Sequence, residues 1–189
     1  MTKPQLSTSP DTATRLALNC ADHPAAREAV PAAQFTSAMS ALASSVSVVT
    51  AGVGGERQGR TVTALLSLSA EPPAILVSIT RDSALAAMIE EAQAFSVSVL
   101  AADQQSVADA FAGFGPAERF SAEQWEAWPS GQPRLDGAVA TLDCRLSGAI
   151  EMDTHVLYAG IVLHTQTHPD RAPLLWHRRH YAVLDSDGV

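Results

Sequence analysis

The chain has 189 residues, of which 47% are hydrophobic and 17% charged, which suffices for one domain with a sizeable core and excludes global disorder. Twelve Lys and Arg against twenty Asp and Glu give a net charge of −8, which argues against binding to nucleic acid or to an anionic membrane surface. No apolar run is long enough to span a membrane and no secretory leader is recognisable, so we expect a soluble, cytoplasmic protein.

Residues 1–33 differ in composition from the rest of the chain. They contain four prolines, scattered Ser, Thr and Ala, and no sustained apolar period, which predicts a flexible or loosely docked N-terminal extension. Arg15–Leu18 could form one helical turn, although nothing in the sequence requires it. We expect the folded domain over residues 34–185, followed by a short tail at 186–189.

The folded part is expected to begin with a helix. Phe35, Met39 and Leu42 recur at helical spacing, which predicts an amphipathic helix over Ala32–Ser44. The rest of the domain shows short β-branched or alternating runs bounded by Gly and Pro, which predict strands. In chain order the predicted strands are Val46–Ala51, Thr61–Leu68, Ala74–Thr80, Phe95–Leu100, Val139–Ile150, His155–Thr167, Leu174–Trp176 and Tyr181–Leu184.

Two further short helices are predicted between the strands. Ser83 is a typical N-cap for a helix that runs to about Ala92, and Gln104–Phe111 is the second. Gly54-Gly55 is a turn signal, so the first two predicted strands should form an antiparallel hairpin. The fold class is therefore mainly β with short helices, and the short connections favour an antiparallel sheet that closes on itself over repeated βαβ units.

Several familiar chemical signatures are absent or weak. Gly52–Arg57 begins like a dinucleotide-binding fingerprint, but it lacks the last glycine and leads into a strand, so we interpret it as a hairpin turn. His164 and His168 are four residues apart on a predicted strand, where that spacing does not align them, so we predict no metal site. Cys144, in an apolar strand, is interpreted as a small core residue.

Hydroxyl side chains are the first candidates for a ligand site. In Thr61–Ser69 they alternate with apolar residues, so one face of the strand can donate hydrogen bonds, although a solvated strand face would show the same pattern. Ser78 and Thr80 add hydroxyls at the end of the next strand. Ser83 at a helix N-terminus could hold a phosphate, or could serve only as an N-cap.

Basic side chains supply the second group of candidates. Eleven of the twelve basic residues are Arg, and Arg171 and residues 177–180 cluster near the C-terminus of an acidic protein. Such a cluster suits a dianionic ligand, but it would also suit a charged edge strand that prevents aggregation. His155 opens a predicted strand, where it could either face a pocket or serve the structure alone.

Taken together, ordered motifs along residues 34–184 resemble the flavin reductase-like family, the small reductase component of two-component flavin-dependent monooxygenases. The resemblance is strongest to the reductase of 4-hydroxyphenylacetate hydroxylase. The motifs, in order, are Phe35–Ser40, Val46–Thr50, Thr61–Ser69 followed by Glu71-Pro72-Pro73, Phe95–Leu100, Phe111-Ala112-Gly113, Glu118-Arg119-Phe120, Pro133-Arg134-Leu135, Leu142-Asp143-Cys144, Thr154-His155 and Pro173–Tyr181.

This resemblance implies an FMN-binding split β-barrel of the antiparallel Greek-key type, assembled as a homodimer. It implies an NAD(P)H-dependent flavin reductase that passes a hydride from nicotinamide C4 to flavin N5 and supplies diffusible reduced FMN, or FAD, to a partner monooxygenase. By family position, the flavin would be bound by Arg60, Thr61, Thr63, Ala64, Ser78, Ile79, Thr80, Ser83 and Ala84, with Phe111 nearby. His155, as the catalytic residue, together with His177, Arg178 and His180 would border the nicotinamide of NADH or NADPH.

The chain departs from the family pattern at two places. Asp153 stands where the family usually has a glycine before the Thr-His pair, and Asp82 and Ala84 stand near the expected phosphate site, which would then rely on Ser83 and Arg81. A non-catalytic flavin carrier or sensor on the same split barrel is therefore the alternative function. An oxidase of the pyridoxamine phosphate type is a weaker alternative, because it would need a more basic phosphate pocket.

Overall fold

The computed structural model describes residues 13–114, 119–121 and 124–184. Residues 1–12 of the predicted extension and the predicted tail at 186–189 lie outside the described residues. The strands are β1 (Thr14–Ala17), β2 (Ser44–Ser45), β3 (Ser47–Val53), β4 (Glu56–Val62), β5 (Leu65–Ala70), β6 (Pro73–Thr80), β7 (Ala94–Val99), β8 (Trp125–Ala127), β9 (Pro133–Leu135), β10 (Ala140–Glu151), β11 (His155–Thr167), β12 (Leu174–His177) and β13 (His180–Val183). The helices are the 3-10 helix η1 (Pro24–Glu28), α1 (Ala32–Met39), α2 (Ala84–Ala92) and α3 (Gln105–Ala112).

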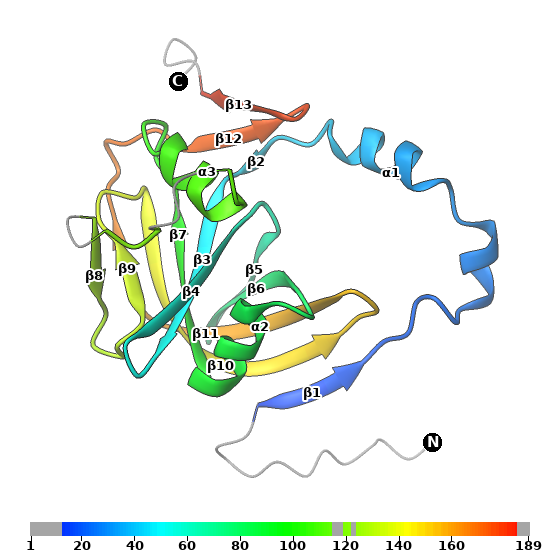
Figure 1. Cartoon of the computed structure of the whole chain (residues 1–189), viewed down its shortest axis with the longest axis horizontal. Coiled ribbons are helices and arrows are strands. Elements are labelled where there is room, and N and C mark those ends of the chain that lie inside the picture. Colours follow the sequence, from blue (N-terminus) through cyan, green and yellow to red (C-terminus); the bar gives the residue numbers. More distant parts are fainter. Residues whose placement is uncertain (1–12, 115–118, 122–123, 185–189) are drawn as a thin grey trace.

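One large sheet dominates the molecule, in the strand order β4-β3-β7-β10-β11-β6-β5 (Figure 1). All neighbours along this path pair antiparallel, which confirms the expected fold class. The short strand β1 adds to β10 in parallel, beyond the point where β7 ends. Two small sheets complete the described part of the chain, β13-β12-β2 and β8-β9.

The sequence favours a sheet that closes on itself, but the observed sheet curves without closing through hydrogen bonds, because β4 and β5 are its two edges among the described residues. The sequence predicts one strand over Thr61–Leu68, and this prediction is wrong, because these residues belong to two strands, β4 and β5. The chain pairs with β3 up to Val62, crosses at Thr63 and Ala64, and then pairs with β6 from Leu65 onward. Two different partners demand two strands, and the crossing leaves a seam between the end of β4 and the ends of β6 and β11.

The strand β3 separates two hydrophobic cores. Its side chains alternate, so Val49 and Ala51 face the interior of the curved sheet together with α2, whereas Val46 and Val48 face an outer core with α3 and buried aromatic rings. A strand buried on both faces needs apolar residues at consecutive positions, as Val48-Val49 supplies, and here the polar Ser47 and Thr50 are fully buried as well. Cys144 lies in the inner core, as predicted, where burial and the charge of Asp143 raise the pKa of its thiol to about 12.

The helix α2 begins where the sequence predicts. The hydroxyl of Ser83 accepts a hydrogen bond from the Ala86 backbone N–H at 3.2 Å and donates one to the Thr80 carbonyl at 2.7 Å, which fixes the turn between β6 and α2. Among the described residues, none of the helices combines the length and the apolar character that crossing a membrane would require.

The N-terminal segment differs from the prediction. Thr14–Ala17 is a strand, so the helical turn considered for Arg15–Leu18 is wrong, and the free edge of β10 beyond β7 explains why a strand forms there. Arg15 forms ion pairs with Glu90 of α2 and with Glu151 of β10. Between β1 and β2, residues 19–43 form an arm that stands away from the sheet (Figure 1).

The helix of this arm, α1, ends at Met39 and not at Ser44 as predicted, because residues 44–45 pair with β12 as β2. None of its residues is buried. The apolar face expected to pack inward is exposed, with Phe35 at 58% and Met39 at 42% of their full accessibility.

Candidate active site

A pocket of about 250 Å³ opens at the seam, and we call it the seam pocket. It is lined from two sides of the seam, by the end of β4 with the crossing residues and by the ends of β6 and β11. Its lining residues are Arg60, Thr61, Val62, Thr63, Ala64, Ser78, Ile79, Thr80 and His155. A second pocket of about 300 Å³, the helix pocket, adjoins it because both share Arg60, Ile79 and Thr80.

The helix pocket surrounds the start of α2. Its lining residues are Gln58, Gly59, Arg60, Ile79, Thr80, Asp82, Ser83, Ala84, Leu85 and Arg119. The helix N-terminus presents backbone N–H groups and the positive end of the helix dipole, and two basic residues, Arg60 and Arg119, line the pocket together with one acidic residue, Asp82. This combination favours an anion such as a phosphate group.

The register of β6 and β11 explains the arrangement of the seam pocket. His155 pairs with Thr80 and Leu157 pairs with Ser78, so the first residues of β11 lie beside the last residues of β6. Strand alternation turns Ile79 into the inner core, where it is 2% exposed, and leaves Thr80 exposed. Ile79 therefore contributes mainly its backbone to the two pockets.

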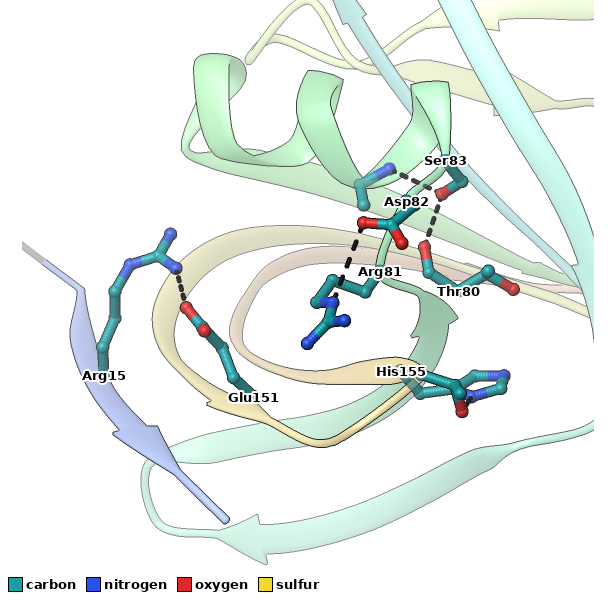
Figure 2. A network of polar contacts seen from close by, with 9 residues as sticks. Arg15, Thr80, Arg81, Asp82, Ser83, Glu151 and His155 are labelled. Carbon is teal, nitrogen blue, oxygen red and sulfur yellow. Dashed lines mark hydrogen bonds and ion pairs between the residues drawn. The ribbon is translucent and has the colours of Figure 1, made fainter. Parts of the chain in front are cut away.

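His155 is the first residue of β11, directly after the turn at Asp153 and Thr154, and it lies beside Thr80 at the end of β6 (Figure 2). Its Nδ1 lies 2.8 Å from the hydroxyl of Thr154, which leaves Nε2 as the nitrogen available to a bound molecule. The Thr154 carbonyl accepts a hydrogen bond from the Arg81 backbone N–H at 3.0 Å, so the turn is tied to the end of β6. Asp153, the departure from the family glycine, is accommodated in this turn.

The site brings together most of the residues expected from the sequence and adds one that was missed. Arg119 lines the helix pocket opposite Ser83, whereas Arg81, expected near a phosphate, pairs with Asp82 at 3.7 Å and does not line the pocket. The one sequence feature that could have pointed to Arg119 as a site residue is its place in the motif Glu118-Arg119-Phe120. Nothing in the sequence shows that Arg119 lies beside the start of α2.

Phe111 does not form part of the surface of either pocket, so its expected place near the cofactor stays a prediction. Its ring is fully buried in the outer core, under Gly59. A Cβ atom at Gly59 would lie only 2.5 Å from Phe111 Cε1, so this glycine lets β4 lie directly on the ring. Phe111 thus supports the wall of the helix pocket from behind.

His177, Arg178 and His180 lie apart from the seam. They belong to the β12–β13 hairpin and line neither the seam pocket nor the helix pocket. The backbone N–H of Arg178 donates to the Ser40 carbonyl at 2.7 Å, which ties the hairpin to the end of the arm. Their expected role at the nicotinamide stays a prediction.

The seam pocket suits a planar ring with a polar edge. Within the described residues β4 pairs only with β3, so the outer edge of Arg60–Val62 offers alternating backbone donors and acceptors. Thr63 and Thr80 add exposed hydroxyls. The Thr61 hydroxyl already donates to the Ala108 carbonyl at 2.6 Å, so it can only accept a hydrogen bond from a ligand.

Comparisons with known proteins agree with this geometry. The family model of the flavin reductase like domain matches residues 39–185. The chain is 38% identical over 164 residues to an NADH:riboflavin 5'-phosphate oxidoreductase of Streptomyces pristinaespiralis, covering 85% of this chain and 92% of the relative. It is 33% identical over 151 residues to the FMN reductase (NADH) RutF of Cronobacter turicensis, covering 79% of this chain and 91% of the relative.

A solved structure shows the same likeness. The flavin reductase component BorF of a bacterial two-component tryptophan halogenase superposes with a TM-score of 0.77 and 31% sequence identity. The match covers 82% of this chain and 99% of BorF. This agreement confirms the expected split-barrel fold.

Proposed function

Since the chain belongs to the flavin reductase-like family, we propose that it is an NAD(P)H-dependent flavin reductase. The observation that carries the proposal is the seam itself, where an unpaired strand edge, a helix N-terminus and an oriented histidine meet around adjoining pockets. The nicotinamide and the flavin would supply the redox chemistry, with a hydride passing from nicotinamide C4 to flavin N5. The protein would hold the two rings face to face and exclude water.

The residues of the seam pocket would bind the polar edge of the flavin ring. Backbone groups along Arg60–Ala64 and the hydroxyl of Thr63 would hydrogen-bond the pyrimidine side of the ring, where negative charge grows on reduction. Fixed donors at that position stabilise the charge without reorganising. Ser78, Ile79 and Thr80 would border the chain that links the ring to the phosphate.

The helix pocket would hold the phosphate, because the N-terminus of α2, Arg60 and Arg119 line it. Ser83 and Ala84 would contribute backbone N–H groups at this position. His155 would hold the nicotinamide through Nε2, without moving a proton, since the hydride transfer requires no acid or base from the protein. We propose FMN as the flavin, because it is the one named for both sequence relatives, with FAD as the alternative.

The reduced flavin would then leave for a separate flavin-dependent monooxygenase. Both pockets lie at the surface of the sheet, which is compatible with release of the product. BorF, a reductase component of a two-component system, supports this role. We place the exchange in the cytoplasm, because the nicotinamide substrate and the oxygenase must share a compartment with the reductase.

The working form is proposed to be a homodimer of the 34–185 domain, with residues 1–33 as an extension. Its support is the apolar surface left on a single chain, since Phe35 and Leu42 of the arm and Leu66 and Leu68 of β5 are between 48% and 58% exposed. A soluble protein rarely leaves so many large apolar side chains open unless a partner covers them.

Oxidation of NADH followed at 340 nm, with and without catalytic FMN, tests the function. We expect slow background oxidation without flavin, rapid oxidation with it, and a flavin that separates from the protein on gel filtration. A yellow flavin that survives gel filtration with negligible turnover would identify the carrier or sensor instead. A rate that stays at background with every flavin and both nicotinamides would refute the reductase.

A further inference from the structure

A third cavity, of about 330 Å³, lies against the segment Thr61–Thr63 and is not explained by the flavin site. It is enclosed by β4, α3 and the β12–β13 hairpin, and we call it the hairpin cleft. Its lining residues are Val46, Thr61, Val62, Thr63, Asp109, Ala112, Phe114, Trp176 and Tyr181. Its volume is within the range of small-molecule sites.

The walls of the hairpin cleft are aromatic. Trp176 and Tyr181 are cross-strand partners in the β12–β13 hairpin, and their rings meet edge to face with centroids 5.0 Å apart. Phe114 stands at the rim with 87% of its surface exposed. Aromatic rings around a narrow cavity favour a planar heterocycle, which can stack on their faces.

One carboxylate provides the charge of the hairpin cleft. Asp109 Oδ1 accepts a hydrogen bond from the Tyr181 hydroxyl at 2.8 Å. Burial, together with the hydrogen bond to Asp109 and its charge, raises the pKa of Tyr181 to about 12, so the phenol keeps its proton and remains a donor at neutral pH. Asp109 thus accepts the Tyr181 hydrogen bond through Oδ1, and its second carboxylate oxygen can accept one from a ligand. None of the nine lining residues is Lys or Arg.

An aromatic slot beside a single carboxylate matches the chemistry of an adenosine group. The carboxylate can accept hydrogen bonds from ribose hydroxyls, whereas a phosphate on the 2'-oxygen would meet a like charge with no Lys or Arg among the described lining residues to offset it. The hairpin cleft and the seam pocket share Thr61, Val62 and Thr63, so they are neighbours along one segment of chain.

We propose that the hairpin cleft binds the adenosine half of the nicotinamide dinucleotide and that Asp109 makes the enzyme select NADH over NADPH. This inference rests on the proposed reductase function, with the nicotinamide beside His155. The β12–β13 hairpin would thus contribute Trp176 and Tyr181 to nucleotide binding. An adenosine group also occurs in FAD, so the test must separate the two sources.

The kinetic test compares three donors, NADH, NADPH and reduced nicotinamide mononucleotide, with FMN as the acceptor. The mononucleotide lacks the adenosine half. Asp109→Asn keeps an acceptor for Tyr181 but removes the charge, and Asp103→Asn, an exposed aspartate outside the cleft, is the matched control. We expect Asp109→Asn to lower the preference for NADH over NADPH by about tenfold and to leave the mononucleotide rate unchanged.

A binding measurement checks the same inference without turnover. Calorimetric titration of the flavin-free protein with 5'-AMP should show binding that weakens in Trp176→Leu, and adenosine 2',5'-bisphosphate should bind at least tenfold more weakly than 5'-AMP. The bisphosphate should gain affinity in Asp109→Asn. The control Asp103→Asn should bind both nucleotides as the unchanged protein does.

Several results would overturn the inference. One is an unchanged donor preference in Asp109→Asn, and another is wild-type use of the mononucleotide at the efficiency of NADH. A change in the KM for FAD alone, with donor preference intact, would assign the hairpin cleft to the flavin and refute the NADH assignment. Failure of the reductase function is distinguishable, because the unchanged protein would then oxidise none of the three donors.

Discussion

His155 lies at the mouth of the seam pocket, with Nδ1 held by Thr154 and the ring beside Thr80. If it holds the nicotinamide equally well before and during hydride transfer, its loss weakens binding more than chemistry. We expect His155→Ala to raise the KM for NADH about tenfold, with a smaller change in kcat and in the KM for FMN. Steady-state kinetics with both substrates varied would show this.

His23→Ala serves as the control for this substitution, since His23 is exposed in the arm. An effect of His155→Ala confined to the KM for FMN would place the histidine on the flavin and contradict its assigned role.

The phosphate assignment can be tested at Ser83 without unfolding α2. Aspartate and asparagine both serve as N-caps, but only aspartate adds a negative charge. We expect Ser83→Asp to raise the KM for FMN by tenfold or more and to leave the KM for riboflavin, which has no phosphate, nearly unchanged. Ser83→Asn, with the cap but no charge, is the matched control. Equal effects of Ser83→Asp on FMN and riboflavin would remove the phosphate from this helix.

At the residue scale, the family resemblance of the sequence predicts two groups of residues that line the seam pocket, Thr61–Ala64 and Ser78–Thr80. The residues of each group are consecutive in the chain. It does not locate Arg119, because the place of Arg119 beside α2 is a contact between residues far apart in the chain, which no local pattern encodes. Nor does it show which way the Phe111 ring faces. A ring in a motif near a site can face the ligand or the core, and only the contact with Gly59 decides between them.

Among the elements, β1 attaches the N-terminal segment to the large sheet. It pairs with β10 at residues 148–151, and Arg15 pairs with both Glu151 and Glu90. We expect Arg15→Glu to lower the free energy of unfolding by about 1 kcal/mol, since two exposed ion pairs become repulsive contacts. Thermal denaturation should show a midpoint lowered by a few degrees, with Arg27→Glu, on the exposed η1, as the control.

An unchanged denaturation temperature would contradict this role of β1. If Arg15→Glu denatures at the same temperature as the unchanged protein, β1 does not hold residues 13–18 against the sheet in solution.

The strands and helices of the central domain follow from local patterns, but their ends depend on pairing partners. Thr61–Leu68 alternates as one strand would, yet its two halves pair with β3 and with β6, which lie on opposite sides of the seam. Similarly, helical spacing continues to Leu42, but the pairing of residues 44–45 with β12 takes over. The sequence of Thr14–Ala17 shows no local strand pattern. This strand forms because its residues pair with the edge of β10.

For the whole molecule, the exposed apolar side chains predict association. We expect light scattering after size-exclusion chromatography to give twice the chain mass of 19.8 kDa. Leu66→Glu should shift the protein towards the monomer, because a charge on the proposed interface would be buried without a partner. Leu163→Glu, at a leucine of similar exposure on β11, is the control. A monomeric mass for the unchanged protein would refute the homodimer.

The central claim is that flavin binds in the seam, between the end of β4 and the ends of β6 and β11. A crystal structure of the protein with FMN tests it most directly. The claim predicts the flavin ring against Thr61–Ala64, one ring face open towards His155, and the phosphate at Ser83 beside Arg119. Flavin bound at any other surface, or a seam filled by another part of the protein while flavin is reduced, would contradict it.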